Sequence, residues 1–363
     1  MSDLTKEVIE EAMKGYTEPH LGRDLVSTKL IKAIEIEGDQ VKVKVTLGFP
    51  AQGVCHAIAA ILREHIEAVP GVSAAKVDVD WEIKAHSVQK SLKPIGQVKN
   101  IIAVASGKGG VGKSTTAVNL ALALAAEGGQ VGILDADIYG PSQPRMLGIT
   151  GKPESKDGNS LEPMTSHGLQ AMSIGFLIDE ETPMIWRGPM VTQALEQLLN
   201  DTNWGELDYL VIDLPPGTGD TQLTLAQKVP VSGAIIVTTP QDIALLDARK
   251  GLKMFQKVEV PVLGIVENMS IHICSKCGHE EHIFGQGGGA SMSEQYGVQL
   301  LGSLPLDIHI REEADSGKPT VVAQPESRIS EIYREIARKT AAKLSLQAKD
   351  YAAKFPRIVI ENN

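Results

Sequence analysis

The sequence predicts a doubly wound, mostly parallel α/β sheet domain preceded by a small α+β domain. From residue 99 onward, short apolar runs rich in β-branched residues alternate with stretches of helical composition, as a parallel sheet requires. A glycine-rich segment, 107–112, separates the first of these strands from the first of these helices. Residues 1–90 carry a shorter pattern of helices and strands without such a segment, which indicates a separate unit.

Length and composition are typical of a soluble chain with more than one domain. The 363 residues are enough for two domains, and 42% hydrophobic with 22% charged residues is an ordinary globular composition. The net charge of −10 argues against general nucleic-acid binding, which depends on lysine and arginine contacts to phosphates. No apolar run approaches the roughly 18 residues of a membrane-spanning helix, and residues 1–7 lack the features of a signal peptide. Because three cysteines do not form a disulfide framework, we expect a protein of the reducing cytoplasm. Since no long apolar run is present, we expect no stable membrane association.

The first predicted domain, residues 1–90, follows from its hydrophobic periodicity. Its expected helices cover 5–14 and 54–69, and its expected strands cover 25–37, 40–47 and 75–83. Residues 91–98, which include a lysine, a proline and a glycine, have the composition of a linker.

The second predicted domain, residues 99–326, alternates strands and helices. Strands are expected at 101–105, 130–134, 169–174, 209–214, 233–238, 262–266 and 299–304. Helices are expected at 115–127, 191–200, 222–228, 243–257 and 291–296. Functional residues should lie at the carboxyl ends of the strands, where sheets of this type bind ligands. The tail, 327–363, has a helical stripe of apolar residues and is expected to pack on its own domain.

A phosphate-binding loop joins the first strand of this domain to its first helix. The pattern Gly107-x-x-x-x-Gly112-Lys113-Ser114 in its strand-to-helix context predicts a P-loop NTPase. A helix N-terminus offers unpaired N–H groups to a triphosphate, and glycines let the backbone approach closely. Lys113 is expected to reach the β- and γ-phosphates, and the Ser114 hydroxyl to ligate Mg²⁺. The residues predicted to contact ATP are Gly107, Lys108, Gly109, Gly110, Val111, Gly112, Lys113, Ser114 and Thr115.

Acidic residues follow two of the predicted strands. Asp135 and Asp137 come after the strand at 130–134, and Asp213 ends the apolar run 209–212. Besides the P-loop, phosphoryl transfer needs a magnesium-binding carboxylate and a group that orients the attacking water. Asp213 is therefore the expected Walker B carboxylate. A helix cap or a loop contact is the alternative for Asp135.

The lysine inside the loop, Lys108, gives a further indication. Gly-Lys-Gly-Gly-Val-Gly-Lys at 107–113 resembles the signature of the deviant P-loop ATPases that include MinD and ParA. This resemblance implies that Lys108 reaches the partner's phosphates in a nucleotide-dependent homodimer; a solvated surface lysine is the alternative. It further implies that Asp137 orients the attacking water and Asp135 supports Mg²⁺, so that the catalytic residues are Lys108, Lys113, Asp137 and Asp213. Adenine contacts are implied for Asn268, Pro305 and Asp307.

A pair of cysteines forms a second candidate site. Cys274-x-x-Cys277, followed by a glycine, has the spacing of a knuckle that binds metal through two thiolates. A closed tetrahedral metal site needs four protein ligands, so two ligand arrangements remain open. Either nearby histidines complete a zinc site within one chain, or two chains contribute two thiolates each to a [4Fe–4S] cluster. The candidate histidines are His272, His279 and His282.

These motifs together resemble the Mrp/ApbC/Nbp35 family of iron–sulfur carrier ATPases. The stretch 18–26 resembles the MIP18-type domain of iron–sulfur assembly proteins, and the motifs at 107–114, 213–220, 274–277 and 284–289 match the family along nearly the whole chain. The resemblance implies a homodimeric ATPase that holds a [4Fe–4S] cluster on Cys274 and Cys277 of both chains. It implies slow ATP hydrolysis coupled to cluster transfer, with apo iron–sulfur proteins, and possible further assembly factors, as partners.

A second hypothesis is a positioning switch like ParA or MinD, in which the cysteine pair is a structural zinc knuckle. It shares every nucleotide residue with the first hypothesis. It differs in needing a membrane or DNA surface to bind, and the acidic body of the chain does not favour either.

Overall fold

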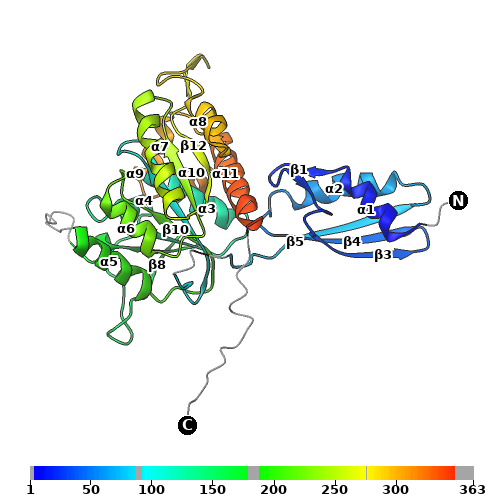
Figure 1. Cartoon of the computed structure of the whole chain (residues 1–363), viewed down its shortest axis with the longest axis horizontal. Helices are drawn as coiled ribbons and strands as arrows, with labels where there is room; N and C mark the ends of the chain where they lie inside the picture. Colours follow the sequence, from blue (N-terminus) through cyan, green and yellow to red (C-terminus); the bar gives the residue numbers. More distant parts are fainter. Residues whose placement is uncertain (1–3, 87, 89–91, 179–187, 275, 348–363) are drawn as a thin grey trace, which may run out of the picture.

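The structure is a computed structural model that describes residues 4–86, 88, 92–178, 188–274 and 276–347. Figure 1 shows two units, a small one formed by the N-terminal residues and a larger one formed by the rest of the chain. The chain passes from the small unit to the large one between β5 (Ala74–Trp81) and β6 (Val98–Ser106). None of the helices in the described part of the chain combines the length and the apolar character needed to span a bilayer.

The small domain is a three-stranded sheet with two helices on one face (Figure 1). Its first two strands form an antiparallel hairpin, and β5 runs parallel to the second of them. Alternate side chains of the central strand are buried, as expected for a strand with one face on a core: Val41, Val43, Val45 and Leu47. The elements are α1 (Lys6–Lys14), β1 (Thr17–Glu18), β2 (Arg23–Asp24), β3 (Ile31–Glu37), β4 (Gln40–Leu47), α2 (Cys55–Glu67) and β5.

The strand predicted over 25–37 is too long at its start, because β3 begins only at Ile31. The Asp24 carboxylate accepts hydrogen bonds from the Ser27 backbone N–H at 2.7 Å and from the Ser27 hydroxyl at 2.6 Å. Lys29 then has a left-handed backbone, with φ of 58°. Such local side-chain bonds compete with strand pairing, so a turn replaces the expected strand.

The large domain is built on one eight-stranded sheet with the order β15-β12-β11-β6-β10-β7-β9-β8. All neighbouring strands are parallel except β8 and β9, which are antiparallel. The P-loop strand β6 is therefore central. The remaining strands are β7 (Val131–Asp135), β8 (Met164–Ser166), β9 (Leu169–Ser173), β10 (Leu207–Asp213), β11 (Gly233–Thr238), β12 (Val262–Glu267) and β15 (Leu300–Ser303).

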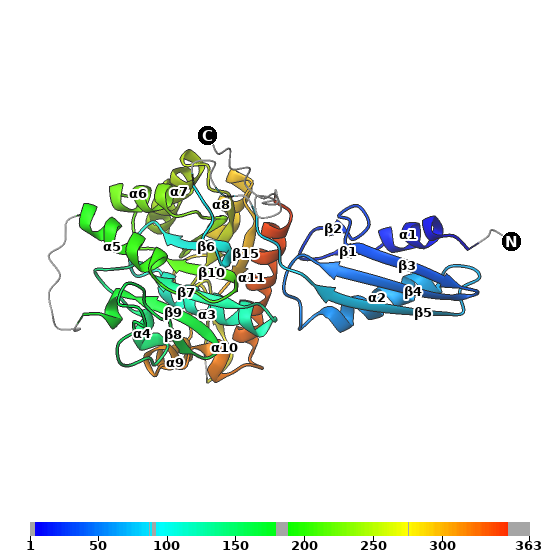
Figure 2. The ribbon, with the colours of Figure 1, turned by 90° about the horizontal axis from the view of Figure 1, so that it is seen from below.

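Helices cover both faces of this sheet, as predicted for a doubly wound fold (Figure 2). One face carries α3 and α11, which pack against each other, and the opposite face carries α7 and α8. The helices are α3 (Lys113–Ala126), α4 (Gln143–Met146), α5 (Gly188–Asn200), α6 (Asp220–Lys228), α7 (Asp242–Lys257), α8 (Gly288–Tyr296), α9 (Ile308–Asp315), α10 (Thr320–Ala323) and α11 (Arg328–Ser345), with a 3-10 turn at Ile174–Phe176. The apolar stripe expected in the tail corresponds to α11, which packs on α3, β12 and β15 of its own domain.

Charged side chains join the two domains at α11 and at the end of α3. Glu127, which follows α3, accepts a hydrogen bond from the Gly53 backbone N–H at 2.9 Å and pairs with Arg338 of α11 at 2.6 Å. His20 of the small domain lies between Glu18 and Glu335, at 2.6 and 2.9 Å. Figure 2 shows α11 on the side of the large domain that faces the small one.

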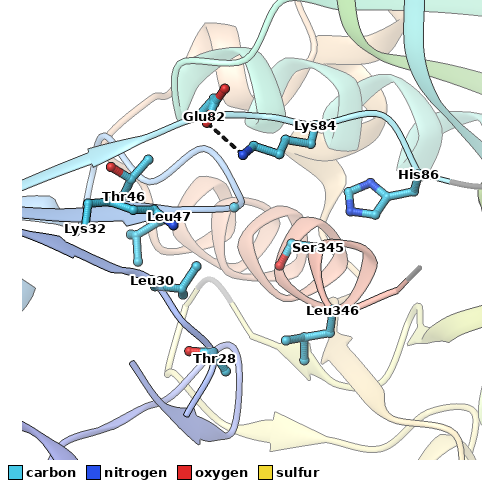
Figure 3. A pocket seen from close by; sticks show the side chains of 11 residues that line it. Thr28, Leu30, Lys32, Thr46, Leu47, Glu82, Lys84, His86, Ser345 and Leu346 are labelled. Atoms are coloured by element: carbon cyan, nitrogen blue, oxygen red, sulfur yellow. Dashed lines mark ion pairs between the residues drawn. The ribbon is translucent and has the colours of Figure 1, made fainter. Parts of the chain in front are cut away.

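A small pocket lies at this junction, between the sheet of the small domain and the end of α11 (Figure 3). Its walls include Leu30, Lys84 and Leu346, and Lys84 pairs with Glu82 at 3.1 Å. The cavity measures about 60 Å³, which is room for a few water molecules and far too little for a nucleotide.

Candidate functional site

The loop between β6 and α3 has a backbone that only glycines allow. A Cβ atom on Gly107 would lie 2.2 Å from the backbone carbonyl carbon of Asp247 in α7. Gly110 and Gly112 have φ of 80° and 79°, the left-handed region that side chains disfavour. The loop is held by Asn268, whose amide donates to the Val111 carbonyl at 2.9 Å. The structure thus forms the narrow, glycine-lined turn at a helix N-terminus that suits phosphate groups.

Lys113 and the acidic residues predicted from the strand ends meet beside this loop. The Lys113 ammonium, 6% exposed, pairs with Asp213 Oδ1 and lies 4.0 Å from an Asp137 oxygen. It also donates to the Ser114 hydroxyl at 3.1 Å. Asp213 is fully buried, and a buried carboxylate needs a compensating cation. Lys113 supplies that charge here, and its contact with the β- and γ-phosphates stays a prediction.

Asp135 is a buried anchor for the segment that follows β7. Its carboxylate accepts hydrogen bonds from the backbone N–H groups of Asp137 at 3.1 Å, Ser142 at 2.9 Å and Gln143 at 3.0 Å. Burial, together with the neighbouring charge of Asp213, raises the pKa of Asp135. This geometry matches the loop contact that the sequence left open for Asp135, and its support of Mg²⁺ stays a prediction.

Burial also raises the pKa of Asp137, against the opposing charge of Lys113. Asp137 therefore lies where a proton-accepting or water-orienting group is expected, beside Lys113. The loop after β10 closes the other side, since the Gly217 N–H donates to the Ser106 carbonyl at 3.0 Å and Gly217 has φ of 103°. The side chain of Asp220, the last residue of the predicted 213–220 motif, lies outside the described residues.

The other predicted nucleotide contacts have defined positions. Lys108 is half-buried in the loop, and its ammonium has no ion-pair partner in the part of the chain that is described. Thr115 lies in the first turn of α3. Asp307 caps α9 by accepting the His309 backbone N–H at 2.8 Å, and Pro305 is half-buried two residues before it. The adenine contacts of Asn268, Pro305 and Asp307 stay predictions.

The cysteine pair lies in a hairpin at the carboxyl edge of the sheet, formed by β13 (His272–Ile273) and β14 (Glu280–Glu281). The Cys274 N–H donates to the His279 carbonyl at 2.9 Å, and the Gly278 N–H donates to the Cys274 carbonyl at 2.8 Å. Backbone N–H groups of Lys276 and Cys277 lower the pKa of the Cys274 thiol. Cys277 is exposed and Cys274 is partly so, which leaves both sulfur atoms accessible for ligation.

Two of the three candidate histidines are engaged elsewhere on their Nδ1 atoms, and the third, His279, is exposed. His272 Nδ1 is 3.2 Å from the Leu306 carbonyl, and His282 Nδ1 is 2.9 Å from the Ser270 carbonyl. Among the described residues, no three His, Cys, Asp or Glu side chains are arranged to hold a metal ion. The zinc site within one chain that the sequence allowed is therefore not preformed there.

Exposed apolar side chains lie at the same edge of the sheet as the cysteine hairpin. Ile243 and Leu246 begin α7 and are 68% and 54% exposed, and Ile308 begins α9 and is 59% exposed. Ile273 and Ile283 belong to the hairpin segment itself. These five residues, the apolar edge, follow the adjacent strands β11, β12 and β15. Exposed large apolar side chains at one edge of a sheet are candidates for an interaction surface.

Gln143 is a site residue that the sequence did not indicate. Its side chain is 1% exposed and donates from Nε2 to Asp213 Oδ2 at 2.9 Å. A glutamine after a strand-end aspartate does not form a distinctive sequence pattern. Only folding brings Gln143 to Asp213, which lies 70 residues further along the sequence.

Comparison with known proteins decides the family. Residues 97–341 match the family model described as NUBPL iron-transfer P-loop NTPase. This chain belongs to that family. Residues 6–79 of this family member match a second model, described as iron–sulfur cluster assembly protein. The resemblance noted in the sequence is thereby confirmed for both domains.

Relatives of this NUBPL-family chain are similar to it in sequence over most of its length. An iron–sulfur cluster carrier protein of Pseudomonas fragi is 61% identical over 279 residues, 76% of this chain and 97% of that protein. The carrier protein of Escherichia coli K12 is 51% identical over 354 residues, 96% and 94% of the two chains. A nucleotide-binding protein of Archaeoglobus fulgidus, solved with ADP, matches with a TM-score of 0.56 and 39% identity, covering 64% of this chain and 90% of that one. The P-loop NTPase fold predicted from the sequence is thus confirmed.

Proposed function

We propose that this chain is an ATP-hydrolysing carrier that binds a [4Fe–4S] cluster between two copies of itself and transfers the cluster to apo-proteins. The observation that carries the proposal is the pairing of a complete P-loop site with an accessible Cys-x-x-Cys hairpin at the carboxyl edge of one sheet. The named relatives, which are iron–sulfur cluster carrier proteins, support the same function.

The nucleotide site fits a magnesium triphosphate. The Ser114 hydroxyl and the Asp213 carboxylate are the kind of oxygen ligands that Mg²⁺ prefers. The Gln143 side chain contacts both residues, and its Oε1 atom is buried without a hydrogen-bond partner within the described ranges. Bound there, Mg²⁺ would neutralise charge on the β- and γ-phosphates. Lys113 leaves Asp213 to bind the phosphates, Asp137 orients water, and Lys108 reaches the partner's nucleotide.

The cluster is the cargo rather than a permanent part of the protein. Each chain offers two thiols, Cys274 and Cys277, so four thiolates require two chains. The apolar edge around the hairpin supports a second copy as the occupant, because a symmetric dimer places the same surface of each chain in contact. Thiolates contributed by two chains favour release of the cluster, because a change in the dimer can separate the cysteine ligands of one chain from those of the other.

Nucleotide binding is the expected trigger for that change. The P-loop, the segment after β7 and the loop after β10 surround the phosphate position, and each is linked to the dimer-facing edge through the sheet. Hydrolysis would alter which of these segments is held by phosphate and so alter the dimer geometry.

The test is the metal content of full-length protein purified without oxygen. Iron, acid-labile sulfide and zinc are measured beside the double variant Cys274→Ala, Cys277→Ala, with Cys55→Ala as the matched control cysteine. The proposal expects iron and sulfide near four per dimer, lost in the double variant and kept in Cys55→Ala. About one zinc per chain without sulfide would overturn it and favour a positioning switch with a structural zinc knuckle.

A further inference from the structure

Gln143 connects three parts of the nucleotide site. It is the first residue of α4, in the segment that follows β7. Its side-chain Nε2 donates to Asp213 Oδ2 at 2.9 Å and to the backbone carbonyl of Ser114 at 3.1 Å. Its own backbone N–H donates to Asp135 at 3.0 Å. One residue therefore links the end of β10, the first turn of α3 and the buried carboxylate at the end of β7.

The two partners fix the orientation of the amide. A backbone carbonyl can only accept a hydrogen bond, and so can an ionised carboxylate. The amide must therefore turn its NH₂ group toward Ser114 and Asp213, and its oxygen toward the other side. The reversed orientation would bring Oε1 against two acceptor oxygens.

The amide oxygen has no such partner. Gln143 Oε1 is buried and, within the described ranges, accepts no hydrogen bond; the neighbouring Ser142 Oγ is in the same condition. Leaving a buried acceptor unsatisfied is costly, because it loses its hydration without gaining a hydrogen bond in return. Two such atoms lie in adjacent residues, and one of them belongs to the side chain that is bonded to Ser114 and Asp213. They indicate a place that a hydrated ligand completes.

We propose that Gln143 is a positioning residue for the metal–nucleotide complex. Nε2 holds the second oxygen of Asp213, and Oε1 accepts a hydrogen bond from a water of the Mg²⁺ coordination shell. This inference rests on the magnesium nucleotide site proposed above and assigns to that site a residue outside its recognised motifs. Outer-shell groups of this kind orient the ligands of a metal and raise its affinity.

The role follows from what Lys113 must do. Lys113 pairs with Asp213 Oδ1, and Gln143 with Oδ2. When Lys113 turns to the phosphates, Mg²⁺ would replace it as the cation beside Asp213, and Gln143 stays as the donor that fixes the rotamer of this carboxylate. Gln143 therefore matters most once nucleotide and metal are bound.

The experiment compares Gln143→Met, which keeps the length of the side chain and removes its hydrogen bonds, with the full-length wild type. Binding of a slowly hydrolysed ATP analogue is measured by calorimetry in EDTA and across a Mg²⁺ series. In Gln143→Met, we expect the Mg²⁺ concentration that gives half of the full increase in affinity for the analogue to rise roughly 10-fold. In EDTA, the affinity of this variant for the analogue should change little. Gln170→Met is the matched control, because the Gln170 amide accepts the Gly205 N–H far from this site.

Three outcomes would overturn the inference. An equal loss of affinity with and without Mg²⁺ assigns Gln143 a structural role only. An unchanged Mg²⁺ dependence shows that the side chain does not act on the metal. A wild type that binds the analogue with no effect of Mg²⁺ removes the metal site itself, and with it that part of the proposed function.

Discussion

Lys113 is expected to change partner when nucleotide binds at the proposed site. In this structure it neutralises the buried Asp213 and lies beside Asp137 and the Ser114 hydroxyl. In the proposed function a phosphate competes for the same ammonium, so nucleotide binding would break one buried ion pair and form another. Part of the binding energy would then be used to rearrange the residues proposed to act in hydrolysis.

Lys113→Ala should abolish nucleotide-dependent cluster transfer while cluster binding survives. The variant removes the phosphate contact and leaves Asp213 buried without its cation, yet does not touch the cysteine hairpin. Transfer to an apo-protein is measured with and without ATP, together with iron content. Lys250→Ala, which loses only an exposed pair with Asp247, is the control. Transfer that still responds to ATP in Lys113→Ala would contradict the mechanism.

His20 has a strongly shifted pKa at the domain junction. Burial opposes its charge, but hydrogen bonds to Glu18 and Glu335 and their charges outweigh burial and raise the pKa of His20 to about 9. The same contact with His20 lowers the pKa of Glu335 to about 2. Both groups are therefore charged near neutral pH and hold the domains together.

The stability that His20 adds should fade in alkaline solution. A raised folded-state pKa stabilises fully below the unfolded value of about 6.5, and this contribution is lost as pH rises through about 9. Compared with His20→Gln, the wild type should gain roughly 3 kcal/mol at pH 6 and little at pH 10, seen by calorimetry. His309→Gln, an exposed histidine beside Asp307, should show no comparable pH dependence. A constant difference across this range would refute the assignment.

At the scale of single elements, α3 spans the distance between the nucleotide and the small domain. It begins at Lys113 in the P-loop and ends at Ala126, next to Glu127 and Gly128. Fourteen helical residues extend for about 21 Å. Gly128 has φ of 98°, and a Cβ there would lie 2.3 Å from the Trp81 ring of the small domain.

Gly128→Ala should loosen the contact between the domains. Alanine in a left-handed conformation costs about 1 kcal/mol, and overpacking against Trp81 adds about 1–3 kcal/mol. Gly151→Ala is the matched control, because Gly151 has φ of 95° and open space around its Cβ position. Calorimetry and protease susceptibility of the segment between the domains report the effect. Equal destabilisation by the two variants would show that Trp81 does not constrain this position.

The whole molecule presents its nucleotide loop, its cysteines and the apolar edge along the carboxyl ends of one sheet. The small domain is attached at α11, away from the cysteine hairpin in Figure 1. A second copy could therefore meet the large domain without displacing the small one. The proposed dimer needs only this one surface to complete both the cluster and the shared nucleotide site.

Charging the apolar edge should prevent the cluster-loaded dimer. Ile243→Asp with Ile308→Asp adds two carboxylates per chain to the proposed interface, where their desolvation opposes association, so we expect monomers and lower iron retention. Mass measurements by light scattering after anaerobic cluster loading provide the readout. Ile61→Asp, on the exposed face of α2 in the small domain, should leave the dimer intact. A dimer of unchanged stability in the double variant would place the interface elsewhere.

Local patterns in the sequence were sufficient for much of this architecture. The β4 strand was predicted with its observed bounds, 40–47, and so was β11 at 233–238. The P-loop was predicted in full because its glycines, lysine and helix are contiguous, and the family follows from motifs of the same kind. Where side chains bond locally to the backbone, as at Asp24 and Ser27, hydrophobic pattern alone predicted a strand that the chain does not form.

The sequence by itself determined the order of strands and helices, the phosphate-binding loop and the cysteine pair, because each depends on neighbours within a few residues. Tertiary structure alone decided which distant side chains meet. It set Gln143 on Asp213, and it joined His20 to Glu335 across 315 residues. Such contacts carry no local pattern, since a single polar side chain is compatible with many environments until packing removes water and requires it to find a partner.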